Sequence, residues 1–508
     1  MPNLAETLQK TAALTSSATR ALAKLPTYSS LLRRARVAWH TRSGGAAPPP
    51  SAFPGWQSVP VLGLLPRLKA ISTDPVGLMV RSHEAYGDIF TIYIPFNSFD
   101  LTYLMGQDGY QFVLGLPAEE GRMGKVMLNV PAMGFWFPRS DESEEHMQAL
   151  VVAARPLMAD LLRRRERPHD EIARSAVARH LPRWGAEVDI GEAVALLVHD
   201  AAATVMFGEK LWARLRPVAG PAIRAIADSV DVARVALAKT PYGRFMPEYR
   251  ATLELHAAFA SAIEEHGRTG AYPVLDRIAA QRLGDEPLPA ADVPWMMLSI
   301  LWNATVYTGA YATWAFCDLL AHPDLQRDLA AADAARRARL LASCLTETIR
   351  QSPVASLPRY VKEPMDIDYR GKRYHIGAGT YLAASPLSLA NDPAVYREPA
   401  RYDPHRYDRG EPAPSLFGRG AFGCVAQGFV YTLVTTLFNE LLGEARFELS
   451  GPLPERVVRI HLTYPSDPIR ARLHRREAPR PALDDPRADP IQHREGAGRC
   501  PFSRLAAR

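Results

Sequence analysis

The chain has 508 residues, 47% of them hydrophobic and 22% charged, which is typical of globular proteins and enough for one large domain or two to three ordinary ones. Its formal net charge of +6 suits an acidic protein partner or an anionic surface, but it is too small to indicate a nucleic-acid-binding protein. The sequence has only four cysteines, which excludes a disulfide framework and favours a reducing, cytoplasmic compartment.

The N-terminal segment is basic: residues 1–45 carry seven lysines and arginines and a single acid, Glu6. Three interpretations are open, namely an amphipathic helix lying on a membrane surface, a transit peptide, or a solvated basic extension. The proline-rich stretch 44–56 then predicts a hinge or linker. No run of eighteen apolar residues occurs, so we expect no membrane span and at most peripheral membrane contact.

The middle of the chain predicts a mostly helical domain with a minor sheet. Short β-branched and aromatic runs predict hairpins at 88–105 and at 365–376, the second turning at Gly371. From about 144 to 333 the segments have helical periodicity, and residues 292–322 are apolar on all sides, as in a buried central helix. We therefore expect an extension and hinge (1–50), one domain (51–475) and a disordered tail (476–508).

The segment "LFGRGAFGCVAQG", residues 416–428, contains the spacing GxGxxG at Gly418, Gly420 and Gly423. A dinucleotide-binding loop with this spacing follows a strand and begins a helix within a βαβ unit. A helical run does follow here, but the residues before the loop include prolines and no β-branched residue. The context therefore argues against a dinucleotide site.

Cys424 lies directly after these glycines and before the helical run. A thiolate at a helix N-terminus is stabilised by the helix dipole and by free N–H groups, and Gly420 lets the loop backbone approach the sulfur closely. Phe417 and Phe422 would exclude water, and such a sulfur suits iron. An inert buried cysteine is an equally good interpretation of this stretch alone. No CxxC, HExxH, GxSxG or P-loop motif indicates another chemistry.

The spacing Phe417-x-x-Gly420-x-x-x-Cys424 resembles the haem-binding signature of the cytochrome P450 family, in which a cysteine thiolate holds the haem iron. The resemblance implies haem b as cofactor, with Cys424 as the metal ligand. It also implies a mainly α fold with a minor β-sheet region. In that fold the helices form a triangular prism, and the haem lies between the central long helix and the cysteine loop.

Two further segments carry the same resemblance. Glu347 and Arg350 form a Glu-x-x-Arg pair similar to the family's buried ion pair, and Arg406 within "YDPHRY" is similar to its third charged partner. Together they imply a structural network behind the haem loop. Arg359 and His146 resemble the residues that reach the haem propionates, although each could instead be an ordinary surface side chain. Leu150 stands where the family often has a second arginine.

The central helix departs from the family's oxygen-activating segment. Gly309 matches the glycine that leaves room for a ligand at the iron. Tyr311 replaces the acid, Ala312 replaces the following threonine, and Thr313 comes one position later. The usual relay of protons by an acid and an alcohol is therefore missing. Tyr307 and Tyr311 could act as proton donors or could be core tyrosines bonded to backbone carbonyls.

The resemblance implies a monooxygenase-type oxidoreductase that acts on a medium-sized hydrophobic molecule of secondary or lipid metabolism. Electrons would come from an acidic ferredoxin or flavodoxin, and the protein would be a monomer. Phe135, Trp136 and Phe137 are assigned to the substrate pocket by position only.

The missing relay leaves alternatives open. One is a haem-thiolate isomerase, lyase or peroxygenase without a redox partner, and another is a haem protein without turnover. The altered helix is loosely similar to the prostacyclin synthase and sterol-oxidising branches of the family.

Overall fold

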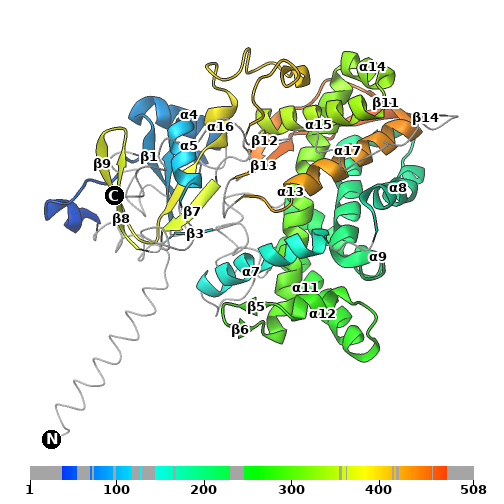
Figure 1. Cartoon of the computed structure of the whole chain (residues 1–508), viewed down its shortest axis with the longest axis horizontal. Coiled ribbons are helices and arrows are strands. Elements are labelled where there is room, and N and C mark those ends of the chain that lie inside the picture. Colours follow the sequence, from blue (N-terminus) through cyan, green and yellow to red (C-terminus); the bar gives the residue numbers. More distant parts are fainter. Residues whose placement is uncertain are drawn as a thin grey trace, which may run out of the picture.

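The computed structural model describes thirteen segments: 37–53, 69–70, 74–94, 99–116, 126–128, 144–163, 167–228, 245–353, 357–361, 363–414, 417–418, 423–459 and 462–476. Figure 1 shows a helical part around the central helix α13 and a smaller part built around strands β1 to β3 and β7 to β10. The helices are α4 (Pro75–Tyr86), α5 (Gly106–Leu114), α7 (Glu144–Arg163), α8 (His169–His180), α9 (Ile190–Asp228), α11 (Pro247–Thr269), α12 (Val274–Ala279), α13 (Val293–Ala321), α14 (Pro323–Ala331), α15 (Ala334–Gln351), α16 (Pro386–Ala390) and α17 (Gln427–Glu444).

Helix α13 is the centre of the helical part, and its burial follows from its sequence. It carries no charged residue before Asp318, and most of its side chains are buried, which confirms the predicted central helix. It packs against α7, α9, α11, α15 and α17. A helix that is apolar on all sides is stable only when other elements cover every face, and these helices do so.

Helix α9 runs along α13 and is bent at Gly208, where φ is +77°. Only glycine adopts this backbone conformation without strain, so the bend has a sequence cause. Its segment Ile190–Ala227 is long and apolar enough to cross a membrane, but 78% of the apolar window is buried inside the fold. In the described part of the chain this is the one helix that passes that test.

The strands form one larger sheet and several small ones. The five-stranded sheet has the order β1-β2-β10-β7-β3, with β10 parallel to β2. The two predicted hairpins are confirmed as β1–β2 and β8–β9, and Gly371 lies in the left-handed turn of the second at φ +75°. The strands are β1 (Ile89–Ile94), β2 (Phe99–Leu104), β3 (Val126–Leu128), β4 (Glu187–Asp189), β5 (Arg282–Leu283), β6 (Glu286–Pro287), β7 (Leu357–Val361), β8 (Met365–Tyr369), β9 (Lys372–Ile376), β10 (Tyr381–Ala384), β11 (Ala445–Leu449), β12 (Arg456–Arg459), β13 (Leu462–Pro465) and β14 (Arg470–Arg475).

The proline-rich stretch differs from the predicted hinge over residues 47–53. Thr91 donates its backbone N–H to the carbonyl of Pro50 at 2.8 Å, and His375 donates its own to Ala47 at 2.9 Å. Phe53 is buried. Proline lacks an N–H but keeps its carbonyl, so it still accepts hydrogen bonds at a sheet edge. This stretch lies along the domain, whereas residues 1–36 and 477–508 fall outside the described segments.

Candidate functional site

The cysteine loop begins the site. The backbone N–H of Cys424 donates to the carbonyl of Phe417 at 2.7 Å, which closes the loop, and helix α17 starts three residues later at Gln427. The Phe417 ring lies 5.8 Å from that of Tyr431 on α17. The predicted helix after the loop is therefore confirmed. Gly420 and Phe422, two of the predicted haem-contacting residues, lie outside the described segments.

The Cys424 thiol of the metal-free protein is acted on by burial and by two groups that oppose its effect on the pKa. Burial raises the pKa of the thiol, while a hydrogen bond from the backbone of Ala426 and the charge of Arg155 lower it by less. The residue nevertheless exposes surface on one side. The protein alone therefore holds a protonated thiol with an open face, and metal binding would displace its proton.

Arg155 is a site residue that the sequence analysis missed. It lies on α7, and its Nη2 donates to the carbonyl of Gly423 at 2.6 Å, directly before the cysteine. The family often has a second arginine at the position of Leu150, and in this chain Leu150 is buried in the core. Arg155 supplies a cation from the same helix five residues later.

Arg359, on strand β7, was predicted to face a haem propionate. Its side chain is 2% exposed, and burial together with the charge of Arg155 lowers its pKa to about 10. Its Nη1 donates to the carbonyl of Pro358 at 2.9 Å. Its guanidinium thus lies close enough to that of Arg155 for the two charges to repel each other, and Arg155 in turn contacts the cysteine loop. Arg359 is buried and Arg155 is half-buried, and such a pair of like charges is stabilised by an anion between or beside them.

His146, the other predicted propionate partner, has a carboxylate neighbour on a different element. Its Nε2 lies 3.1 Å from Oδ2 of Asp292, the residue that precedes α13. Asp292 is almost fully buried. This pair joins the start of α7 to the start of α13, and a propionate would have to compete with Asp292 for the imidazole.

Glu347, Arg350 and Arg406 form one buried network, as the sequence predicted. Glu347 accepts hydrogen bonds from Arg350 at 2.7 and 2.9 Å and from Nε of Arg406 at 3.1 Å. The hydroxyl of Tyr407 donates to the same carboxylate at 2.8 Å, and the backbone N–H of Asp403 does so at 3.1 Å. All three charged side chains are at most 1% exposed.

The arginines also hold the backbone that leads to the cysteine loop. Arg350 donates to the carbonyls of Ala390 and Pro399 at 2.5 and 2.7 Å. Arg406 donates to the carbonyl of Arg401 at 2.9 Å and to the carboxylate of Glu411 at 2.6 Å. The network therefore ties α15 to segment 390–411, and a buried charge with complete partners fixes one arrangement of that segment.

On α13, the space next to Gly309 was predicted to leave room for a ligand at the iron, but the ring of His199 fills it. A Cβ at this position would lie 2.5 Å from Nε2 of His199, a buried residue of α9. The glycine thus lets an imidazole pack against the helix backbone. Burial, and secondarily the charge of Arg224, lowers the pKa of His199 to about 4. The ring is therefore neutral at physiological pH.

The next residues of α13 contain no acid–alcohol pair. Thr313 donates its hydroxyl to the carbonyl of Gly191 at 3.1 Å, and so it is tied to the start of α9. Ala312 and Tyr311 are buried. Burial and the neighbouring Tyr464 raise the pKa of Tyr307 well above its ordinary value. The Tyr307 hydroxyl therefore stays protonated and can only donate or accept hydrogen bonds.

A cavity of about 430 Å³ lies between α9, α13 and the strand β13 with the loop after it. His199 and Thr313 line it, together with Arg224, Tyr464 and Asp467. Nδ1 of His199 is buried and has no hydrogen-bond partner among the described residues. The predicted pocket residues Phe135, Trp136 and Phe137 lie outside those residues.

These features fit haem b, the group implied by the sequence resemblance. Cys424 offers an exposed thiol sulfur, Arg155 provides a cation beside it, and Arg359 provides a second cation close enough to Arg155 to feel its charge. Cysteine thiolate is a known axial ligand of haem iron. The residues that would hold haem are therefore Cys424 through its sulfur and the two arginines through their guanidiniums.

Comparisons with known proteins point the same way. A family model described as cytochrome P450 matches residues 53–452. Obtusifoliol 14-alpha demethylase of Sorghum bicolor is 22% identical over 445 residues, which cover 82% of this chain and 88% of the relative. Sterol 14alpha-demethylase of Mycolicibacterium vanbaalenii is 22% identical over 421 residues, covering 76% and 89% of the two chains.

A solved structure shares the fold. Cyanobacterial CYP120A1, determined with retinoic acid bound, superposes with a TM-score of 0.63 at 19% sequence identity and covers 84% of this chain and 99% of its own. The helical part around α13 and the small sheets are thus a P450 fold. This chain belongs to the cytochrome P450 family, and it is a haem-thiolate monooxygenase.

Proposed function

We propose that this enzyme oxidises a medium-sized hydrophobic molecule of sterol or terpenoid type in lipid or secondary metabolism. The observation that carries the proposal is the similarity to sterol 14-demethylases along most of both chains. Electrons would come from an acidic ferredoxin or flavodoxin, which suits the net charge of +6.

In this proposal each of the site residues has its own role. Haem bound through a cysteine thiolate supplies the oxygen chemistry, since the thiolate favours cleavage of the O–O bond. Cys424 holds the iron, and the Glu347 network keeps the segment before the loop in place. Arg155 and Arg359 orient the propionates, with His146 as a further candidate. Helix α13, which is uncharged before Asp318 and mostly buried, would exclude water from the site.

A second candidate function has its own observation. Neither Ala312 nor Tyr311 can accept and pass on a proton as a carboxylate does, and the hydroxyl of Thr313 is bonded to the Gly191 carbonyl. The second candidate is therefore a reaction that needs less delivery of protons to the site. A peroxide-driven reaction, or rearrangement of a substrate that is already oxidised, would meet that condition without a redox partner.

We further propose a cytoplasmic monomer with peripheral membrane contact through the N-terminal segment. Trp39 supports the contact, because it is 74% exposed on the short helix that begins the described chain. Exposed tryptophan beside basic residues is typical of segments that lie at a membrane interface. Binding of the full chain to anionic vesicles, compared with Trp39→Ala, tests this point.

Turnover assays separate the two candidate functions. Purified holoenzyme is incubated with a sterol and terpenoid panel, once with NADPH, a ferredoxin and its reductase, and once with hydrogen peroxide. Product that forms only with the electron-transfer chain supports the first proposal. Product with peroxide alone, or an isomer formed without any oxidant, supports the second. Failure of every sterol and terpenoid with both systems would overturn the proposed substrate class.

A further inference from the structure

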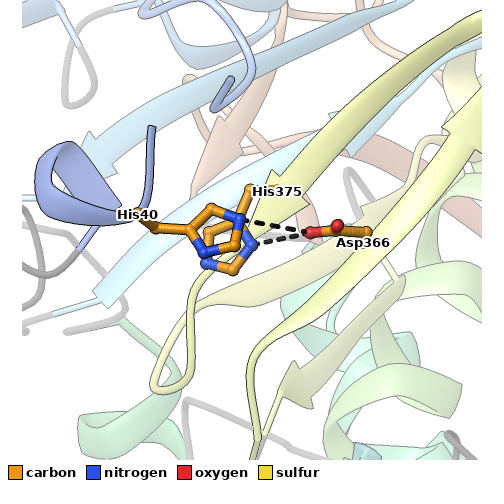
Figure 2. Close-up of side chains that lie close together, drawn as sticks. All are labelled: His40, Asp366 and His375. Carbon is orange, nitrogen blue, oxygen red and sulfur yellow. Dashed lines mark hydrogen bonds and ion pairs between the residues drawn. The ribbon is translucent and has the colours of Figure 1, made fainter. Parts of the chain in front are cut away.

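A cluster of two histidines and one aspartate lies far from the cysteine loop in the sequence. Figure 2 shows His40, at the start of the described chain, beside His375 of β9, with a nitrogen of each ring directed at Asp366 of β8. One ligand atom from each residue lies within 4.8 Å of the others. Imidazole nitrogen and carboxylate oxygen are the ligands of many zinc sites.

The distances are close to those that a metal ion needs. Oδ1 of Asp366 lies 2.7 Å from Nδ1 of His375 and 3.9 Å from Nε2 of His40. Zinc binds such atoms at about 2.0–2.2 Å, so two ligands of a tetrahedral ion are roughly 3.3 Å apart. These two separations therefore change by about 0.6 Å on binding, one lengthening and the other shortening, while the two histidine nitrogens start within 4.8 Å of each other.

The two rings are stacked, with centroids 3.8 Å apart and planes at 20°, so their lone pairs run side by side. One ring must turn about its Cβ–Cγ bond to converge on an ion. His40 can turn without losing a hydrogen bond, because its buried Nε2 has no hydrogen-bond partner among the described residues. A side chain at position 45 would prevent this, since a Cβ on Gly45 would lie 2.1 Å from that nitrogen.

The carboxylate is ready to act as an anionic ligand. The hydrogen bond from His375 holds the pKa of Asp366 below its ordinary value, and the charges of His375, Arg373 and His40 add to this effect. Nε of Arg373 lies 3.5 Å from the other carboxylate oxygen, Oδ2, which leaves Oδ1 for the ion. Arg373 is exposed, so solvent and salt screen its repulsion of a cation.

We propose that His40, Asp366 and His375 bind one divalent transition-metal ion of the zinc type, with His40 turning toward the ion and water completing the four ligands. The ion would tie residues 37–47 to the β8–β9 hairpin, where His375 already donates its backbone N–H to Ala47. This site is independent of the haem chemistry, so it does not rest on the proposed function.

Equilibrium dialysis of the untagged holoenzyme against zinc chloride tests the site, with bound zinc measured per protein chain by elemental analysis. We expect one saturable zinc ion, bound at least about tenfold more weakly by His40→Gln and by His375→Ala. His83→Ala is the matched control. His83 pairs with Asp88 at 2.8 Å, as His375 does with Asp366. Among the described residues, however, the His83–Asp88 pair is not part of a group of three possible metal ligands.

Absence of saturable zinc binding, or equal binding by all four proteins, would overturn the proposal. His375 is 8% exposed on its side chain, and its variant could misfold, so circular dichroism accompanies each measurement. His40 is 39% exposed, so His40→Gln is the variant that decides the outcome if His375→Ala misfolds. As a second readout, zinc should slow tryptic cleavage after Arg42 in the native protein and should leave His40→Gln unaffected.

Discussion

Glu347 and His199 are both buried ionisable residues, but their surroundings differ. Glu347 accepts hydrogen bonds from two guanidiniums, a hydroxyl and a backbone N–H, so its charge is fully compensated. His199 is packed against the backbone at Gly309, and its Nδ1 has no hydrogen-bond partner among the described residues. The fold thus holds a charge on the cysteine side and a neutral ring on the α13 side.

The difference shows which side of the site is fixed by the family's pattern. On the cysteine side, one carboxylate organises segments that are about 60 residues apart, so each member of the network constrains the others. On the α13 side, the acid–alcohol pair is missing, and Gly309 instead packs closely against His199 of α9. Five variants or conditions test this contrast, beginning with the largest expected effect.

Glu347→Gln should give the largest loss of stability. It removes the charge that compensates Arg350 and Arg406, and breaking a buried ion pair costs about 3–5 kcal/mol. Urea unfolding of the holoenzyme measures the change. Glu398→Gln is the control, because Glu398 is 62% exposed and pairs with Arg401 at 3.5 Å. A loss below about 1 kcal/mol, the size expected for a surface pair, would contradict the role of the network.

Gly309→Ala should destabilise the protein by about 1–3 kcal/mol, because the new methyl group overlaps the His199 ring. When His199→Ala has already removed the ring, adding Gly309→Ala should cost less stability than it does in the native protein. Gly267→Ala, on α11, is the matched control, since nothing lies within 4 Å of its Cβ position. Equal effects at both glycines would show that the His199 contact is unimportant.

Arg155→Gln should weaken haem retention. The variant loses a charged hydrogen bond to the Gly423 carbonyl and one of the two cations beside the cysteine. We expect a cost of about 1.4 kcal/mol, or roughly tenfold faster haem transfer to apomyoglobin. Arg163→Gln on the same helix is the control, because Arg163 is 74% exposed. An unchanged rate of haem transfer would show that Arg155 does not contribute to haem binding.

The pH dependence of unfolding tests the neutral state of His199. Its pKa is about 4 in the folded protein, below the ordinary value of 6.5, so the unfolded chain binds more protons at mildly acid pH. The contribution of His199 to the free energy of unfolding is therefore fully present above pH 6.5 and is lost as the pH falls towards 4. The free energy of unfolding should drop by about 1 kcal/mol more in the native protein than in His199→Gln between pH 7 and pH 5.5. Parallel curves would contradict the assignment.

Ala312→Thr should produce the smallest change. It restores an alcohol to α13, so we expect no loss of turnover and less uncoupled peroxide release. Product and peroxide are measured together with NADPH as the electron source. A large loss of product would show that alanine is required at this position, and it would favour the peroxide or rearrangement chemistry.

Much of the fold could be predicted from sequence, because local patterns determine it. The uncharged run before Asp318 indicated the buried helix α13, and alternating residues around Gly371 indicated the β8–β9 hairpin. The Glu347 network was predicted only through the family resemblance. A Glu-x-x-Arg pair by itself is common on exposed helices and does not indicate burial.

The features that sequence could not predict all depend on contacts between distant segments. Gly309 meets His199 from 110 positions away, so its role could not be derived from the helix itself. Arg155 could not be found by the family's spacing, because its role depends on the packing of α7 on the cysteine loop. The pKa of the metal-free Cys424 thiol likewise depends on how deeply the fold buries it, because burial outweighs the local N–H groups.

The central claim is that Cys424 holds haem iron through its sulfur, and a carbon monoxide spectrum tests it most directly. The protein is expressed with a haem supply, reduced with dithionite and exposed to carbon monoxide, and Cys424→Ser is treated in the same way. The account predicts a thiolate-type carbonyl band in the native protein and its absence in the variant. A native protein that binds haem without that band, or a variant that keeps it, would contradict the account.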